Sequence, residues 1–446
     1  MAAAVGALFC ATSAAAQEAP TTPPAPVAAA PAAPPAPPPL TAGWDGNHLF
    51  IKSPDGQFHL SPAGYFIPQH TIYAGDGAPA NGFRLKYARF GVVGGYGKSV
   101  DYGILADFAG TTGSVLRDVY VRVNVAPWLR LQAGQFKEPF SAEALIGDPN
   151  VELWDRSIVQ MLYPSATNSF RSPGAMAFGA AGDGMLEYWA GAFNGRGLSN
   201  PASSNWPELV SRLRAWPLRW TKSPAVERIG VGGSLAYSRT AAIAQEQSFS
   251  GAINDGAYTF FPSFPVNGPV RRYNVDLVWL WNSLGLRAEY SELQQARDDV
   301  GASSTTGGGF QSLPTVVGRG FYVQGSYWLT GERAEENAAP RVRHPLVGPA
   351  SADADEGSGY GAFQVVARAA WVDAKAPGRT FDTFTPTSVP GYTADTYQLT
   401  FGVNWYLNQW AAYKLNLDVD RLNQPSVQGI LPQTYFAVIQ QLQVQL

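Results

Sequence analysis

Basic side chains recur at alternate positions of segments whose intervening positions are apolar. Arginine keeps its charge and offers a planar fork of donors that suits oxyanions. Because successive strand residues point to opposite faces, this spacing would gather the basic groups on one polar face. Lys137 and Arg156 join the set through a long link described below. The candidate anion-binding residues are Arg84, Lys86, Arg122, Arg130, Lys137, Arg156, Arg272, Arg287, Arg368 and Lys414.

Acidic residues interleave with these basic ones. The candidate counter-charges are Asp107, Asp118, Asp155 and Asp276. For any single arginine, an ion pair with a carboxylate that braces the protein is the simpler role. The polar face is therefore expected to have only a slight positive surplus.

The sequence offers little for catalysis, metal binding or a cofactor. It contains no G-x-S-x-G nucleophile elbow. Its single cysteine, Cys10, excludes a disulfide framework and a CxxC site. The four histidines form no ligand cluster with metal spacing; they are His48, His59, His70 and His344. We expect no metal, no cofactor and no enzymatic activity.

The composition excludes several classes of protein. Only 15% of the 446 residues are charged, against about 25% in a typical soluble domain. Aromatic residues make up 13%, and the net charge is -3. A disordered chain would have more charge and fewer aromatics, and a nucleic-acid binder would be basic. The sequence contains no run of about 18 apolar residues, which a membrane-spanning helix would need.

Period-2 alternation of apolar and polar residues predicts an all-β fold. The pattern is clean at 397–408, where the odd positions are apolar and large. Sixteen segments show it with varying strength. They are 60–73, 83–97, 100–109, 115–124, 129–137, 174–181, 185–194, 208–216, 229–239, 273–281, 284–292, 320–330, 362–373, 397–408, 411–420 and 435–446.

The links between these segments alternate between short and long. Tight links such as 97–100 and 407–410 follow long ones such as 138–173 and 240–271; the long link 331–361 breaks the order. Short turns on one rim and long loops on the other are typical of a transmembrane antiparallel β-barrel. Tyr and Trp near the strand ends fit a membrane interface. The apolar face is then expected to contact lipid and the polar face to line the lumen.

Two arginines, Arg89 and Arg117, fall on the predicted lipid-facing side. Arginine at the bilayer midplane costs about 2–4 kcal/mol. A β-bulge or a subunit contact is therefore expected at Arg89.

The N-terminal residues predict an export signal followed by a spacer. Residues 1–16 combine a short apolar stretch with Ala14-Ala15-Ala16, a site of the kind that signal peptidase cleaves. Residues 17–45 are rich in Ala and Pro, and proline joins neither helix nor sheet readily. We expect a signal peptide at 1–16, a spacer at 17–45 and a barrel at 46–446.

Several stretches resemble the phosphate-selective porin O and P family of Gram-negative outer membranes. They are Gly134–Ser141, Trp154–Ser157, Phe193–Gly195, Tyr322–Glu332 and Gly402–Asn408. The resemblance implies a sixteen-stranded barrel in the outer membrane that assembles as a homotrimer. It also implies that the third long loop, 138–173 here, folds inward and narrows the pore, with Lys137 at its root and Asp155 and Arg156 along it.

One family feature is altered in this chain. Where the family carries an adjacent pair of arginines on its second strand, this sequence reads Lys86-Tyr87-Ala88-Arg89. We therefore expect a diffusion pore for small hydrophilic solutes with a modest anion preference, phosphate or other oxyanions being candidates. The partners expected are outer-membrane lipid and these solutes, without nucleic acid. A lipase-like barrel enzyme and a plugged structural or adhesive barrel are the alternatives.

Overall fold

The computed structural model divides the chain into two units, Met1–Pro39 and Leu40–Leu446. The predicted signal peptide and residues 17–38 of the predicted spacer lie outside the described residues. The second unit holds all of the described secondary structure. The residues described are 39–44, 49–75, 78–109, 115–163, 170–195, 197–199, 205–240, 246–248, 252–253, 258–259, 263–301, 311–347, 359–377, 380–381, 388–389, 392–423 and 433–445.

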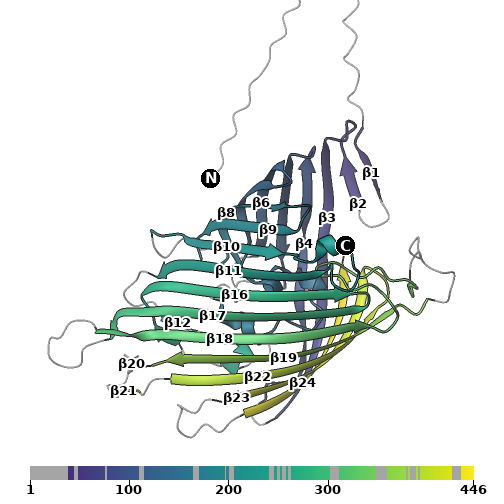
Figure 1. The fold of residues 1–446 in the computed structure, drawn as a ribbon. Coiled ribbons are helices and arrows are strands. Elements are labelled where there is room, and N and C mark those ends of the chain that lie inside the picture. Colours follow the sequence, from purple (N-terminus) through teal and green to yellow (C-terminus); the bar gives the residue numbers. More distant parts are fainter. Residues whose placement is uncertain are drawn as a thin grey trace, which may run out of the picture. The chain divides into compact units, whose positions relative to one another are not determined.

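Sixteen antiparallel strands form a closed barrel (Figure 1). Each pairs with the next along the chain, and the last closes the barrel on the first through pairs such as Ile439↔Thr71. The predicted fold is confirmed, and each predicted segment corresponds to one strand. The barrel strands are β3 (Phe58–Ala74), β4 (Gly82–Tyr96), β5 (Val100–Asp107), β6 (Leu116–Ala126), β7 (Leu129–Lys137), β8 (Arg171–Ala181), β9 (Leu186–Phe193), β10 (Glu208–Ala215), β11 (Ile229–Thr240), β16 (Gly268–Trp281), β17 (Leu284–Gly301), β18 (Gln311–Trp328), β19 (Ala362–Ala376), β22 (Tyr392–Tyr406), β23 (Ala411–Asn423) and β24 (Gln433–Gln445).

The strands of the C-terminal half are longer than the sequence pattern indicates. Strands β17 and β18 have 18 residues each, whereas the alternation predicts only 284–292 and 320–330. The added length of β17 carries polar residues on both faces, such as Gln294 and Gln295. A pattern that depends on one apolar face ends where that face becomes polar.

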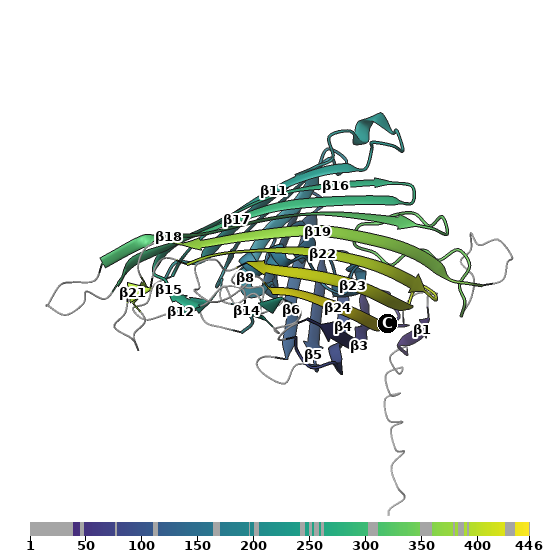
Figure 2. The same cartoon turned by 90° about the horizontal axis from the view of Figure 1, so that it is seen from below.

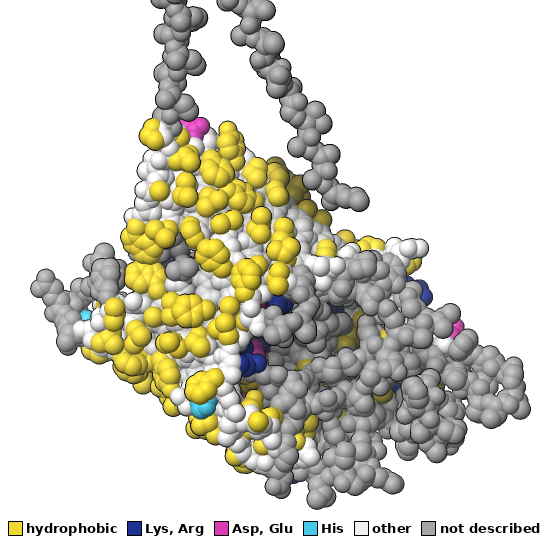
Figure 3. Space-filling view, turned by 180° about the vertical axis from the view of Figure 1, so that it is seen from behind, with side chains coloured by type: hydrophobic (Ala, Val, Ile, Leu, Met, Phe, Trp, Pro, Cys, Tyr) yellow, Lys and Arg dark blue, Asp and Glu magenta, His cyan; other side chains and the backbone are white. Residues whose placement is uncertain are grey.

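Side chains alternate between the barrel interior and its outer surface. On β16, Asn274 and Asp276 are buried inside, whereas Val275 and Leu277 are 57% and 43% exposed. Hydrophobic side chains likewise dominate the described surface on the face seen in Figure 3. An apolar outside around a polar inside is the arrangement of a membrane barrel and the reverse of a small soluble one.

Two β-bulges turn Arg89 and Arg117 toward the interior of the barrel. The pairing of β3 with β4 passes from Ile67↔Tyr87 to Pro68↔Leu85, so Lys86 is the extra residue and Arg89 becomes buried. The pairing of β5 with β6 skips Arg117 in the same way. The bulge expected at Arg89 is confirmed, and the assignment of both arginines to the lipid-facing side is wrong, because a bulge reverses the parity of a strand.

A short hairpin precedes the barrel. Its strands β1 (Thr41–Trp44) and β2 (Leu49–Lys52) pair with each other, and β2 extends onto β3. Residues 41–44, the C-terminal part of the predicted spacer, are paired in this hairpin. The other two-stranded pairs join β12 (Glu246–Ser248) to β15 (Ser263–Pro265), β13 (Ala252–Ile253) to β14 (Tyr258–Thr259) and β20 (Thr380–Phe381) to β21 (Ser388–Val389).

The helical elements are short and lie in the links between strands. The link after β7 contains α1 (Ala142–Leu145), η1 (Asp148–Asn150) and η2 (Ile158–Leu162), and the link after β10 contains η4 (Arg219–Thr221). No helix in the described ranges has the length and apolar character needed to cross a membrane. Figure 2 shows the strands running between links at their two ends.

Candidate functional site

Residues 138–163, here called the inward loop, run across the interior of the barrel. The hydroxyl of Ser141 donates to Glu289 on β17 at 2.5 Å, and the carbonyl of Trp154 accepts from Gln441 on β24 at 2.9 Å. These contacts lie on different parts of the wall. Residues 171–173, predicted as loop, belong to β8.

Asp148 connects the inward loop to the first two barrel strands. Its carboxylate accepts from Arg156 at 2.6 Å and from the Tyr65 hydroxyl at 2.7 Å, and it forms an ion pair with Arg89. Burial raises the pKa of Asp148, but Arg89, Arg156 and Lys137 outweigh burial and hold the pKa well below its usual range. The carboxylate is therefore ionised and tethers the loop.

Local backbone features direct these partners toward Asp148. The bulge at Lys86 turns Arg89 inward, and Gly134 has φ +130° where an added Cβ would lie 2.1 Å from the Val119 carbonyl oxygen. Only glycine tolerates that close approach. Three residues later, Lys137 donates to the carbonyl oxygens of Ala144 and Ile146 at 2.7 and 2.6 Å, which fixes the root of the loop.

Glu152 contacts the opposite wall. Its carboxylate accepts from Arg287 on β17 at 2.5 Å, from Gln324 and Ser326 on β18 at 2.7 and 3.0 Å, and from Gln364 on β19 at 2.8 Å. Four donors from three neighbouring strands satisfy the oxygens of this carboxylate. The middle of the loop is thus held on the side of the barrel away from β4.

Glu143 completes the set of loop carboxylates. It forms an ion pair of 3.3 Å with Arg368 on β19 and accepts from the Ser157 hydroxyl at 2.8 Å. Beyond it, η2 places Val159 and Leu162 in an apolar cluster with wall residues such as Val372. The last part of the loop is therefore held by apolar contacts as well as by charge.

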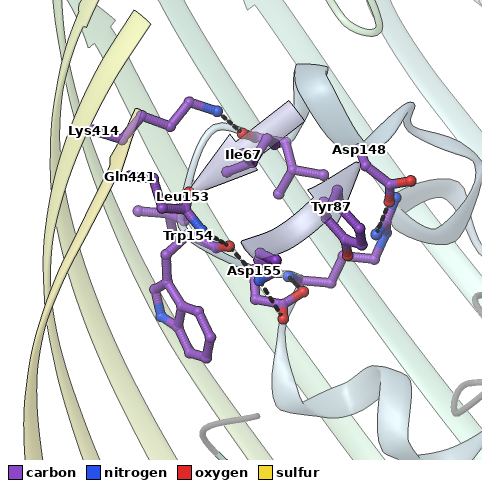
Figure 4. Close-up of a pocket in the computed structure, with 11 residues that line it drawn as sticks. Ile67, Tyr87, Asp148, Leu153, Trp154, Asp155, Lys414 and Gln441 are labelled. Carbon is purple, nitrogen blue, oxygen red and sulfur yellow. Dashed lines mark hydrogen bonds and ion pairs between the residues drawn. The ribbon is translucent and has the colours of Figure 1, made fainter. Parts of the chain in front are cut away.

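A pocket separates the inward loop from the wall near β3, β4, β23 and β24 (Figure 4). Across it, Lys86 donates to Asp155 and to the Trp154 carbonyl, both at 2.7 Å, while Lys414 donates to the Val151 carbonyl at 2.6 Å. Burial raises the pKa of Asp155, but Lys86 and Arg156 together hold it below its usual value. Both wall lysines are thus engaged by the loop.

Seven of the ten candidate anion-binding residues contact the inward loop or belong to it. Six of these contacts are given above. The seventh is Arg272, which forms ion pairs with Glu138 at 3.1 Å and with Glu208. The residues are Lys86, Lys137, Arg156, Arg272, Arg287, Arg368 and Lys414.

The other three candidates lie on the wall away from these contacts. Arg122 forms an ion pair of 3.6 Å with Asp101, Arg84 donates to Gln69 at 3.4 Å, and the Arg130 guanidinium lies 5.9 Å from the Phe178 ring. Their side chains are exposed or half-buried. An anion-binding role stays a prediction for all ten residues.

The candidate counter-charges each meet a basic group. Asp107 pairs with Arg89 and Arg117, Asp118 with Arg171, Asp155 with Lys86, and Asp276 with Arg212. Sequence reasoning missed Glu143, Asp148 and Glu152, because the loop has no periodicity from which to infer where its acidic residues point.

A second segment meets the inward loop. The side-chain oxygen of Asn337 accepts from the Gly147 backbone at 2.7 Å and from Asn150 at 3.1 Å. Neighbouring Glu335 and Glu336 form ion pairs with Arg228 at 2.8 Å and Arg214 at 2.7 Å. This segment belongs to the link between β18 and β19, the one that breaks the alternation of link lengths. Within the described residues, no group of three or more His, Cys, Asp or Glu side chains is placed to hold a metal.

Comparison with known proteins gives a family match. The family model described as phosphate-selective porin O and P matches residues 71–422. No curated protein sequence matches the chain.

Solved structures with the same fold include outer-membrane proteins. The trimer form of OmpT from Vibrio cholerae has a TM-score of 0.51 at 10% identity, over 87% of this chain and 100% of that one. The outer-membrane channel DcaP of Acinetobacter baumannii has a TM-score of 0.52 at 11% identity, over 89% of this chain and 99% of that one. At such low identity the likeness concerns the fold.

The substitution Asp148→Asn should destabilise the protein at neutral pH by about 3 kcal/mol, because it leaves buried cations without their partner. A carboxyl with a depressed pKa stabilises the fold above its ordinary pKa, and that stability is lost as pH falls through the folded pKa. The wild type should therefore lose this contribution only in acid below the ordinary pKa of 3.8. Unfolding of the detergent-solubilised protein at several pH values measures both effects.

The matched control for this experiment is Asp101→Asn. The Asp101 side chain is 34% exposed in its pair with Arg122, and exposed pairs contribute little. If both variants unfold like the wild type at pH 7, Asp148 does not tether the loop.

Proposed function

The chain belongs to the phosphate-selective porin O and P family, and on this premise we propose that it is a general diffusion pore with a modest anion preference and without a high-affinity phosphate site. Its family and its barrel fold support an outer-membrane porin channel. The proposal about selectivity rests on the pairing of interior cations with carboxylates of the inward loop.

A selective anion site needs several positive groups that converge in a narrow space and remain available to the ion. In the interior, Arg287 contacts Glu152, Arg368 contacts Glu143, and Lys86 contacts Asp155. A passing anion would have to compete with these fixed carboxylates. The pairing therefore argues against tight binding.

The second strand supports the same conclusion. At the positions where the resemblance implies adjacent arginines, this chain has Lys86 and Tyr87. Lysine is a compact, strongly hydrated charge without the planar fork of arginine, and tyrosine is uncharged at neutral pH. The bidentate grip on an oxyanion is weakened accordingly.

A weaker preference for anions remains. Arg84, Arg122 and Arg130 have exposed or half-buried side chains on β4, β6 and β7, where Asp101 is the acidic neighbour of Arg122. Incompletely neutralised basic groups along a lumen raise the local concentration of anions. We place the solute path along this wall, with the inward loop as the constriction.

A homotrimer is supported by the lengths of the strands. Strands β5, β9 and β10 have 8 residues each; tilted by about 45°, such a strand spans about 19 Å, less than the apolar band of about 25 Å. A wall too short for the bilayer is better covered by protein than by lipid. OmpT, which shares the fold, has a trimer form.

A plugged barrel without conductance is the second candidate, because the inward loop is bonded to many strands of the wall. Single-channel recording separates the two functions, since a plugged barrel passes no steady current.

Deleting residues 149–158 should raise single-channel conductance and strengthen the anion preference. The deletion removes Glu152 and Asp155, so Arg287 and Lys86 are released toward the lumen, while strand pairing does not depend on the loop. Glu152→Gln, which leaves the chain length unchanged, should shift selectivity in the same direction by a smaller amount. Unchanged conductance in a folded deletion variant would refute the assignment of the constriction.

In a KCl gradient the reversal potential should have the sign of an anion-preferring pore. The preference should weaken at 1 M salt, where the screening length falls to about 3 Å. Millimolar phosphate should leave the chloride current largely unblocked. Arg122→Ser/Arg130→Ser should reduce the preference, whereas Arg219→Ser, in the link after β10, should not. Block by micromolar phosphate would instead indicate a specific phosphate channel.

Cysteine cross-linking in isolated outer membranes tests the trimer. Ile104→Cys on β5 and Val403→Cys on β22 introduce outward thiols at sites that are each 47% exposed. A short bifunctional maleimide should link subunits through position 104 and not through position 403. Equal linking at both positions would contradict an interface on the short strands.

A further inference from the structure

Charged side chains lie at one level on the outer surface of the long strands. Glu292 pairs across the sheet with Arg319, Arg319 with Asp373, and Asp373 with Asp395. Parity places all four outside the barrel, on β17, β18, β19 and β22. Three further outward charges flank this row: Arg271 and Lys375 lie one outward position nearer the long links, and Arg421, which pairs with Tyr397, lies one outward position nearer the short turns. We call this set the charged belt; it comprises Arg271, Glu292, Arg319, Asp373, Lys375, Asp395 and Arg421.

A row of aromatic side chains lies next to the charged belt, one outward position nearer the short turns. Tyr290 pairs with Phe321, Phe321 with Trp371, and Trp371 with Tyr397. Tyr290, Phe321 and Tyr397 are 39%, 45% and 52% exposed. Such girdles mark the boundary of the hydrocarbon layer. The charged belt therefore begins where the apolar band ends, on the rim with the long links.

The opposite rim has no such belt. Near the short turns, the outward positions of the same strands carry aromatic residues such as Trp281, Tyr327 and Trp405. No Lys, Arg, Asp or Glu occupies a described outward position at that end of β16–β19, β22 or β23. Long links are typical of the outside of the cell. The outward charges thus mark the level of the outer leaflet alone.

The basic groups of the charged belt remain accessible. Arg319 pairs with Glu292 at 3.0 Å and Lys375 with Asp373 at 3.3 Å, yet the two basic side chains are 49% and 55% exposed. Arg271 and Arg421 are exposed, and neither forms an ion pair with a residue that the structure describes. Exposed pairs contribute little to stability, so these guanidinium groups are available to a ligand.

We propose that the charged belt binds the phosphate head groups of anionic lipids in the outer leaflet, with Arg271, Arg319 and Arg421 as the main donors. Guanidinium groups bind phosphate oxygens through paired hydrogen bonds, and basic residues next to an anionic membrane surface are attracted to it. This inference rests on the outer-membrane location of the proposed porin and adds a ligand on its outer surface, away from the lumen.

The shape of the charged belt favours lipid over free phosphate. Its members are distributed over six adjacent strands, and neighbouring strands lie about 4.8 Å apart, so the charged belt extends over about 24 Å. One small ion would contact only one or two of these residues. A row of head groups held in a plane would contact all of them at once.

The test measures binding of diphosphoryl lipid A to the full-length protein in neutral detergent, by native mass spectrometry. Arg271→Ser/Arg421→Ser should bind about thirtyfold more weakly than the wild type, the order expected when two basic residues near a membrane surface are removed. The matched control is Arg333→Ser/Arg341→Ser, which removes two exposed arginines from the link at the other rim and should bind like the wild type. Lipid A without phosphates should bind weakly to all three proteins.

Three outcomes would overturn the proposal: equal binding by the wild type and the Arg271/Arg421 variant, equal binding of phosphate-free lipid A, or displacement of lipid A by millimolar inorganic phosphate, which would indicate a site for the free ion. If the serine variant does not run as a folded barrel on gels, Arg271→Gln/Arg421→Gln replaces it with the same expectation. Conductance of the wild type in a neutral bilayer tests the pore separately, so either proposal can fail alone.

Discussion

Charge compensation inside the barrel is the constraint on which the position of the inward loop depends. A buried ion is costly unless it is paired and hydrogen-bonded. Three carboxylates of the loop each form an ion pair with an arginine on a different part of the wall. A shift of the loop along the wall would therefore leave charges buried without partners. The three pairs are Asp148–Arg89, Glu152–Arg287 and Glu143–Arg368.

The same compensation limits what the pore can select. Each carboxylate that holds the loop also neutralises a wall cation that would otherwise face a passing anion. Lys86 shows this directly, because its amino group contacts Asp155 and lies 4.6 Å from the Trp154 ring. A loop held by charge and a lumen rich in free positive charge are therefore competing requirements. In this chain ion pairing with the loop prevails over most of the wall, and the proposed anion preference rests on the exposed basic groups of β4, β6 and β7.

The sequence predicted the strands better than the contacts between them. Alternation located all sixteen because lipid outside and polar groups inside impose opposite demands on neighbouring residues. It failed where one face ceased to be apolar, as on β17 beyond Glu292. Arg89 was informative because its charge broke the apolar/polar alternation of its strand, and a β-bulge accounts for the break. The partners of Asp148 and Glu152 could not be predicted, because the loop that carries them repeats no pattern and its contacts join residues distant in the chain.

Arg271 and Arg272 are adjacent on β16 but face opposite sides of the barrel wall, so the same residue type has two different roles. Arg272 points inward and forms ion pairs with Glu138 and Glu208, so its charge supports the root of the inward loop. Arg271 points outward and belongs to the charged belt, one outward position beyond Tyr273. A bulge between them would put both arginines on the same face, which would leave either the buried carboxylates of Glu138 and Glu208 or the charged belt without a cation. The regular pairing of β16 with both of its neighbours is therefore required by the interior and the outer surface together.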